Sequence, residues 1–205
     1  MLAPETRPEP SDDVSQYKVY LIGFSATGKS HSGRLAAQEL GAMFIDMDRL
    51  IVRRAGKQIS AIFENDGEDE FRRMEREVLA EQAEASGQRV VSTGGGVPVD
   101  SRNREVMAAS GLTIRLVASP ETIYSRISGS ASRRTQRSSR SPETRPMLAG
   151  CGDDDTTVER VRELLSEREG AYAAAADVTV DTEGREPPDV AAEIVARVLE
   201  SKSQG

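Results

Sequence analysis

Short apolar runs alternate with longer amphipathic stretches along most of the chain, a pattern typical of a parallel sheet covered by helices. Strands are predicted over residues 19–22, 43–46, 89–92, 112–117 and 178–180. Helices are predicted over residues 29–40, 68–86, 158–176 and 189–199. A further helix is expected to begin at Ser119, because a capping serine, a proline and an acid follow one another there. The pattern therefore predicts an α/β fold, a doubly wound three-layer sandwich.

One domain is predicted over residues 17–200. Residues 1–16 are rich in proline, glutamate and aspartate and are predicted to form a flexible tail, and residues 201–205 a flexible end. Residues 128–152 have no hydrophobic periodicity and contain many serines, arginines and glycines, which predicts a long loop inserted late in the domain.

Composition and charge exclude several kinds of partner. The chain has 205 residues and a formal net charge of −7, so nucleic acids and anionic membranes are poor partners. No apolar run approaches the ~20 residues needed to cross a bilayer. Residues 1–16 lack the apolar segment of a secretory signal, and the single cysteine, Cys151, cannot form an internal disulfide. A cytoplasmic protein is expected.

A phosphate-binding motif follows the first predicted strand. Residues 23–30 read GFSATGKS, which matches G-x-x-x-x-G-K-S. In such a loop backbone N–H groups surround the phosphates, Lys29 supplies a positive charge, and Ser30 offers a hydroxyl to Mg²⁺. A turn without a ligand is the alternative, but the position between a predicted strand and a predicted helix favours a nucleotide site.

Two carboxylates end the second predicted strand. Asp46 and Asp48 are two residues apart in a segment predicted to be extended, so their side chains are expected to point the same way. At the carboxyl end of a parallel strand they would face the ligand crevice. One could hold Mg²⁺, directly or through water, while the other accepts the proton of a hydroxyl group. The alternative is that Asp48 only caps the next helix and Asp46 is solvated.

A possible binding site for an anionic acceptor comes from the middle of the chain. Arg72 and Glu75 are three residues apart on a predicted helix and share a face, although a surface ion pair is the usual role of such residues. The glycines at 94–96 follow a buried strand and would let the backbone approach a ligand closely. Arg145 and Arg168 add cations suited to gripping a carboxylate. A polyhydroxy acid would fit such a site.

The chain resembles the shikimate kinase family over residues 18–199. The resemblance rests on the stretches GFSATGKS, GRLAAQELG, FIDMD, GKQISAIFENDGEDEFRRMEREVL, VVSTGGG, RPML, REGAY and ADVTVDT. It implies a five-stranded parallel sheet of order 2-3-1-4-5. It also implies transfer of a phosphoryl group from ATP to the 3-hydroxyl of shikimate, on the route to chorismate and the aromatic amino acids.

The resemblance also assigns roles to residues. Asp48 would be the base, Lys29 and Arg145 the other catalytic residues, and Ser30 and Asp46 would hold Mg²⁺, the latter through water. ATP is assigned to Thr27, Gly28, Lys29, Ser30, His31, Arg134, Arg145 and Pro187. Shikimate is assigned to Asp48, Arg72, Glu75, Gly94, Gly95, Gly96 and Arg168. The six arginines from Arg126 to Arg145, both included, would form a mobile lid over ATP. An RNA-binding stretch is the alternative for these arginines, but it lacks aromatic residues to stack on bases.

The chain departs from the family pattern at a few positions. Ala26 and His31 stand where the family usually has glycine and threonine, Met147 replaces a leucine, and the lid has several extra residues. The departure at Ala26 matters if that position needs a positive φ. Two other functions stay open: a kinase for another hydroxy acid, such as gluconate, and a nucleotide-binding regulator without kinase activity. A monomer is expected.

Overall fold

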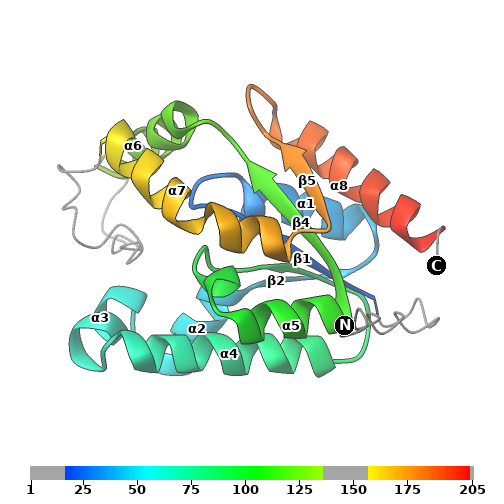
Figure 1. The fold of residues 1–205 in the computed structure, drawn as a ribbon, viewed down its shortest axis with the longest axis horizontal. Helices are drawn as coiled ribbons and strands as arrows, with labels where there is room; N and C mark the ends of the chain where they lie inside the picture. Colours follow the sequence, from blue (N-terminus) through cyan, green and yellow to red (C-terminus); the bar gives the residue numbers. More distant parts are fainter. Residues whose placement is uncertain (1–16, 136–156, 204–205) are drawn as a thin grey trace, which may run out of the picture.

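The computed structural model describes residues 17–135 and 157–203, without the side chains of residues 130–135. Its centre is a parallel sheet of five strands in the order β2-β3-β1-β4-β5 (Figure 1). The strands are β1 (Lys18–Ile22), β2 (Met43–Asp46), β3 (Arg89–Ser92), β4 (Gly111–Val117) and β5 (Val178–Asp181). The predicted fold class and strand order are confirmed.

Helices cover both faces of the sheet (Figure 1). They are α1 (Lys29–Glu39), α2 (Met47–Ala55), α3 (Ile59–Asn65), α4 (Glu68–Glu84), α5 (Ser101–Ser110), α6 (Pro120–Thr135), α7 (Val158–Ala175) and α8 (Pro187–Lys202). A short 3₁₀ helix, η2, spans Val97–Val99. Within the described ranges, no helix combines the length and the apolar character needed to cross a membrane.

Alternating side chains of β1 divide the core into two layers. Val19 and Leu21 pack with buried residues of α1 and α8 on one face. Tyr20 and Ile22 pack with buried residues of α2, α4, α5 and α7 on the other. Successive side chains of a strand point to opposite faces, so a strand covered on both sides must be apolar throughout. This explains why the buried central strand is a continuous apolar run in the sequence.

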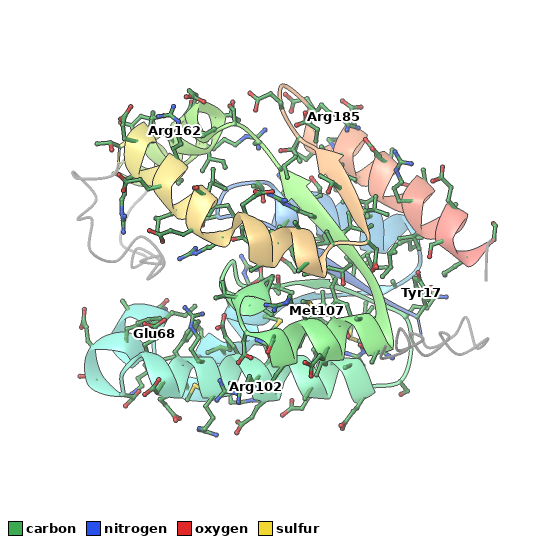
Figure 2. All side chains as sticks on the ribbon, in the orientation of Figure 1. Tyr17, Glu68, Arg102, Met107, Arg162 and Arg185 are labelled. Carbon is green, nitrogen blue, oxygen red and sulfur yellow. The ribbon has the colours of Figure 1, made fainter. Side chains whose placement is uncertain are left out.

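Charged side chains occupy the outer surfaces of the helices. Glu68, Arg102 and Arg162 point outward from α4, α5 and α7 (Figure 2), whereas Met107 of α5 is buried against the sheet.

A third group of buried side chains, Phe24, Ile123, Val161 and Leu164, packs α6 and α7 together beside the loop that follows β1. α6 and α7 are thereby packed against Phe24 of the phosphate-binding motif.

Several helices differ from the sequence-based expectation. α2 and α5 were not predicted; each begins at an aspartate that accepts a hydrogen bond from the backbone of its first turn, Asp46 and Asp100. α6 continues to Thr135, so residues 128–135 are helical rather than part of a loop. No proline interrupts this stretch, and alanine and arginine sustain a helix without an apolar stripe. α8 likewise runs past its expected end to Lys202.

Candidate active site

The carboxyl ends of β1, β2 and β3 open into one cavity of about 720 Å³. Parallel strands end at the same edge of a sheet, so residues that follow each strand meet there although they are far apart in the sequence. The cavity is lined by the phosphate-binding loop, one face of α2, the start of α3, part of α4 and the segment 92–95.

The loop after β1 has the geometry expected of a phosphate-binding loop. Gly28 begins α1 in a left-handed conformation with φ 97°, and its carbonyl accepts hydrogen bonds from the backbone of His31 and Ser32. Gly23 has φ 133°, and a Cβ there would lie on the carbonyl of Leu116. The first turn of α1, rich in N–H donors, therefore faces the cavity. The hydroxyl of buried Thr27 donates to the carbonyl of Phe24 at 2.8 Å and stiffens the loop.

Lys29 lies inside this loop. Its Nζ donates hydrogen bonds to the carbonyls of Gly23 and Phe24, at 2.7 and 2.8 Å, and the side chain is only 9% exposed. The ammonium group is therefore held within the loop, at the position where phosphate oxygens would approach. A fixed positive charge in that place costs little reorganisation when an anion binds.

An oxygen-rich corner joins α1 to β2 and β3. The hydroxyl of Ser30 donates to Asp46 Oδ2 at 2.8 Å and lies 3.3 Å from the hydroxyl of Ser92. Hydroxyl and carboxylate oxygens are the ligands that Mg²⁺ prefers, and this ion usually keeps several waters and binds substrate phosphates. Mg²⁺ therefore needs few ligands from the protein. The described residues contain no cluster of three or more His, Cys, Asp or Glu side chains that could hold a metal ion. Ser92 was not predicted; its place at the end of a strand, before three glycines, is the signal that could have found it.

The reason given for the shared direction of Asp46 and Asp48 was wrong. The strand ends at Asp46, which caps α2 by accepting a hydrogen bond from the backbone of Arg49 at 3.2 Å. Asp48 lies in the first turn of α2, so helix geometry rather than strand alternation brings it to the cavity. The capping role suggested for Asp48 belongs to Asp46. Both side chains nevertheless line the cavity, as expected.

On α4, Arg72 and Glu75 form an inward-facing ion pair. Arg72 Nη1 lies 2.5 Å from Glu75 Oε2, and Glu75 is 1% exposed, so a solvated surface pair does not describe it. Burial raises the pKa of Glu75 to about 7, opposed by Arg72 and reinforced by the negative charge of Asp48. Glu75 Oε1 is buried without a hydrogen-bond partner among the described residues. Because Glu75 also lines the cavity, this oxygen is available to a ligand or to water.

The glycine run packs directly against these charges. A Cβ at Gly94 would lie 2.7 Å from Glu75 Oε1 and 3.0 Å from Asp48 Oδ1, and one at Gly96 would collide with the guanidinium of Arg72. The absence of side chains at these positions lets the backbone lie beside the acid pair. The expected close approach of backbone to the site is therefore present.

Arg168 reaches the same region from α7. Its guanidinium lies 5.6 Å from the centre of the Phe24 ring, and its Nη1 is buried without a hydrogen-bond partner among the described residues. Burial raises the pKa of the nearby Tyr172 hydroxyl, and the positive charge of Arg168 opposes this shift. Tyr172 in turn donates to the carbonyl of Gly95 at 2.8 Å. Tyr172 was not among the predicted site residues, although it belongs to the same REGAY stretch as Arg168.

Of the other residues predicted to bind the nucleotide, two have described side chains and two do not. His31 is exposed at the rim of the cavity, whereas Pro187 stands in the first turn of α8 and does not line it. Arg145 lies outside the described residues, and Arg134 lies in the part of α6 whose side chains are not described. Their assignments remain predictions.

A phosphate-binding loop after the first strand of a 2-3-1-4-5 parallel sheet, with a lysine and an oxygen-rich corner beside it, defines a P-loop kinase. The family model described as "Shikimate kinase" matches residues 25–199. The chain belongs to the shikimate kinase family, as predicted.

Individual relatives agree with this assignment. The chain is 42% identical to a shikimate kinase of Geobacter sulfurreducens over 182 residues, which cover 89% of this chain and 91% of the relative. A structure of shikimate kinase from Acinetobacter baumannii in complex with shikimate superposes with a TM-score of 0.75 at 29% identity, covering 91% of this chain and 94% of the other. A gluconokinase from Sinorhizobium meliloti has a TM-score of 0.56 at 17% identity, with 92% and 95% coverage, and this likeness shows the fold alone.

Proposed function

We propose that this chain transfers the γ-phosphoryl group of ATP to the 3-hydroxyl of shikimate, giving 3-phosphoshikimate and ADP. The observation that carries the proposal is the Arg72–Glu75 pair, in which buried Glu75 lines the same cavity as the phosphate-binding loop and packs against Gly94 and Asp48. A donor site for phosphates is thus joined to an acceptor site built from an arginine, two carboxylates and backbone groups. Such groups suit an acid with several hydroxyl groups.

Each side of the cavity would perform part of the reaction. Arg72 and Arg168 would bind the carboxylate of shikimate, with Glu75 orienting Arg72 and with backbone groups of the glycine run meeting other oxygens. Asp48 would accept the proton of the 3-hydroxyl while the hydroxyl oxygen forms a bond to the γ-phosphorus. At the same time the bond between the γ-phosphorus and the β,γ-bridging oxygen breaks, which releases ADP. Lys29 and the N-terminus of α1 would stabilise the charge on the transferring group and on departing ADP.

Mg²⁺ would fit the corner formed by Ser30 and Asp46, the latter acting through water. When bound there, it supplies a positive charge that neutralises the β- and γ-phosphate oxygens. Arg145 would add a cation from a lid that follows α6, and Arg134 and Pro187 would flank the adenine. A monomer acting in the cytoplasm on a small molecule, with neither nucleic acid nor membrane as partner, is part of the same proposal.

Another acceptor is the second candidate, and the acceptor side of the cavity disfavours it. The Arg72–Glu75 pair and the glycine run match the residues that the family resemblance assigns to shikimate, and the likeness to the gluconokinase extends only to the fold. A regulator without kinase activity would not require Asp48 and the Ser30–Asp46 pair at one cavity.

The test is release of ADP from Mg-ATP, measured with shikimate, with gluconate and without an acceptor. Wild type is compared with Arg72→Ala and with Arg54→Ala. Arg54 is the matched control, because it also pairs with a glutamate at 2.5 Å, Glu81, but both side chains are exposed. We expect strong stimulation by shikimate alone, lost or shifted to a higher KM in Arg72→Ala and unchanged in Arg54→Ala. Stimulation by gluconate, or none by shikimate while ATP still binds, would overturn the proposed acceptor.

A further inference from the structure

The glycine run forms a tight turn that its sequence does not restrict to one conformation. Val97 N donates to the carbonyl of Gly94 at 3.2 Å, which closes a four-residue turn over residues 94–97. Gly96 has φ −90° and ψ −15°, the values of the third residue of a type I turn. A type II turn requires a positive φ at that residue, which glycine adopts without steric cost. The two forms differ by a flip of the peptide between Gly95 and Gly96.

Tyr172 contacts this peptide. Its hydroxyl donates to the carbonyl oxygen of Gly95 at 2.8 Å, in a fully buried position. Arg115 also contacts the ring: its guanidinium lies 5.3 Å from the ring centre and donates to both carboxylate oxygens of Glu169. The tyrosine ring is therefore held in place, and its hydroxyl contacts the turn from a fixed position.

The positive charge of Arg168 limits the acceptors open to the hydroxyl proton. Arg168 lies near enough to Tyr172 for its charge to act on the pKa of the hydroxyl, and a guanidinium cannot accept a hydrogen bond, so the hydroxyl proton points to another acceptor. The carbonyl of Gly95 is such an acceptor, whereas a flipped peptide would present an N–H group in its place. Because a trans peptide is planar, with C=O and N–H on opposite sides, fixing the Gly95 carbonyl also fixes the direction of the Gly96 N–H.

We propose that Tyr172 is a positioning residue of the acceptor site, whose hydroxyl selects the orientation that turns the Gly96 N–H toward an oxygen of the bound acceptor. In the flipped orientation a carbonyl oxygen would face the oxygens of an anionic ligand and repel them. Arg168 and Tyr172, one helical turn apart on α7, thus act on the acceptor together, one by direct charge and the other through the backbone. The inference rests on the proposed function, because it places the acceptor at the glycine run.

The test compares Tyr172→Phe with Tyr20→Phe. Tyr20 is a matched control: it is fully buried on the same face of the sheet and its hydroxyl has one partner, Ser110 Oγ at 2.7 Å, away from the cavity. Urea unfolding gives the cost of each lost hydroxyl, and steady-state kinetics with each substrate varied gives the KM values. We expect similar losses of stability in both variants. Only Tyr172→Phe should raise the KM for shikimate, about three- to tenfold, the range of one hydrogen bond, with the KM for ATP unchanged.

An unchanged KM for shikimate, or equal increases for both substrates, would overturn the role of Tyr172. Arg72→Ala in the same assay separates this failure from failure of the proposed function. If Arg72→Ala weakens shikimate binding and Tyr172→Phe does not, only the inference on Tyr172 is wrong; if neither does, the acceptor site is wrong. Should Tyr172→Phe not fold, NMR of wild type decides: the Gly96 amide resonance should shift on addition of shikimate, and a resonance insensitive to shikimate would overturn the proposal.

Discussion

The guanidinium of Arg126 on α6 donates a hydrogen bond to the carbonyl oxygen of Ala26 in the phosphate-binding loop, at 3.3 Å. It also donates to the hydroxyl and the carbonyl of Thr182, at 3.0 and 2.7 Å. Ala26 has φ 63° and is the only non-glycine residue with a positive φ in the part of the chain that the structure describes. The helix that leads toward residue 136 is thus linked to the strained residue of the loop. Because carbonyl and N–H groups of a peptide point apart, this contact also turns the N–H of Thr27 away from Arg126.

Replacing Ala26 by glycine should stabilise the protein. A left-handed conformation costs an L-residue about 1 kcal/mol, and glycine adopts it freely. We therefore expect Ala26→Gly to raise the free energy of unfolding by up to about 1 kcal/mol in urea. Ala80→Gly, the same chemical change inside α4, is the control and should lower it by about 1 kcal/mol. A lower stability for both variants would contradict the assigned strain.

Arg126 should contribute more to the binding of ADP when residue 26 is alanine than when it is glycine. Arg126→Met removes the donor while keeping an unbranched side chain, and we expect it to weaken the binding of Mg-ADP. In the Ala26→Gly background the loss should be smaller, because glycine needs no support to hold a positive φ. A double-mutant cycle on the dissociation constant of ADP, measured by calorimetry, gives this coupling. Strictly additive effects would show that the Arg126 contact does not support Ala26.

Gly94 should tolerate no side chain. The Cβ of Gly94→Ala would meet Glu75 Oε1 at 2.7 Å and Asp48 Oδ1 at 3.0 Å, so one of the two carboxylates must move. We expect at least a tenfold loss of kcat/KM for shikimate, since displacement of a reacting group is costly. Gly170→Ala on α7, where nothing lies within 4 Å of the added atom, is the control. It should leave the kinetics intact and gain up to about 1 kcal/mol of stability. Near-normal activity of Gly94→Ala would mean that the two carboxylates are not held in place by the turn.

The sequence predicted those parts of the fold whose signals are local. Strand runs and the phosphate loop could be placed because hydrophobic period and glycine positions follow from chain geometry. α5 was missed because its buried face consists of Asn103 and Met107, too little for an apolar stripe. The contacts of Tyr172 and Arg126 could not be predicted, because they join segments 77 and 100 residues apart in the sequence. From the sequence, the alanine at position 26 matters only if that position needs a positive φ. The backbone of the structure shows that it does, with φ 63°.

Glu75 should make stability depend on pH in the direction opposite to most carboxylates. Its pKa is 4.5 in its ordinary state and about 7 in the folded protein, mainly because of burial. Below pH 4.5 the group is protonated in both states. As the pH rises toward 7 the unfolded chain ionises first, so the folded state loses relative stability, by about 3 kcal/mol in all. The free energy of unfolding of wild type minus that of Glu75→Gln should therefore fall between pH 5 and pH 8. Glu81→Gln is the control, since the pKa of exposed Glu81 is lowered by Arg54; a similar fall there, or a flat difference for Glu75→Gln, would contradict the prediction.

The same titration should appear in substrate binding. Ionised Glu75 holds Arg72 Nη1 at 2.5 Å, whereas the protonated carboxyl group attracts the guanidinium less and leaves Arg72 to its exposed partner Glu68. If Arg72 grips the carboxylate of shikimate only when Glu75 orients it, the KM for shikimate should fall as the pH rises through about 7. In Glu75→Gln the KM should be high and independent of pH over that range, and the KM for ATP should not follow the titration in either protein. A KM for shikimate that is flat with pH in wild type would mean that Arg72 keeps its position without the charge of Glu75, and that the ion pair serves the packing of α4 rather than the acceptor.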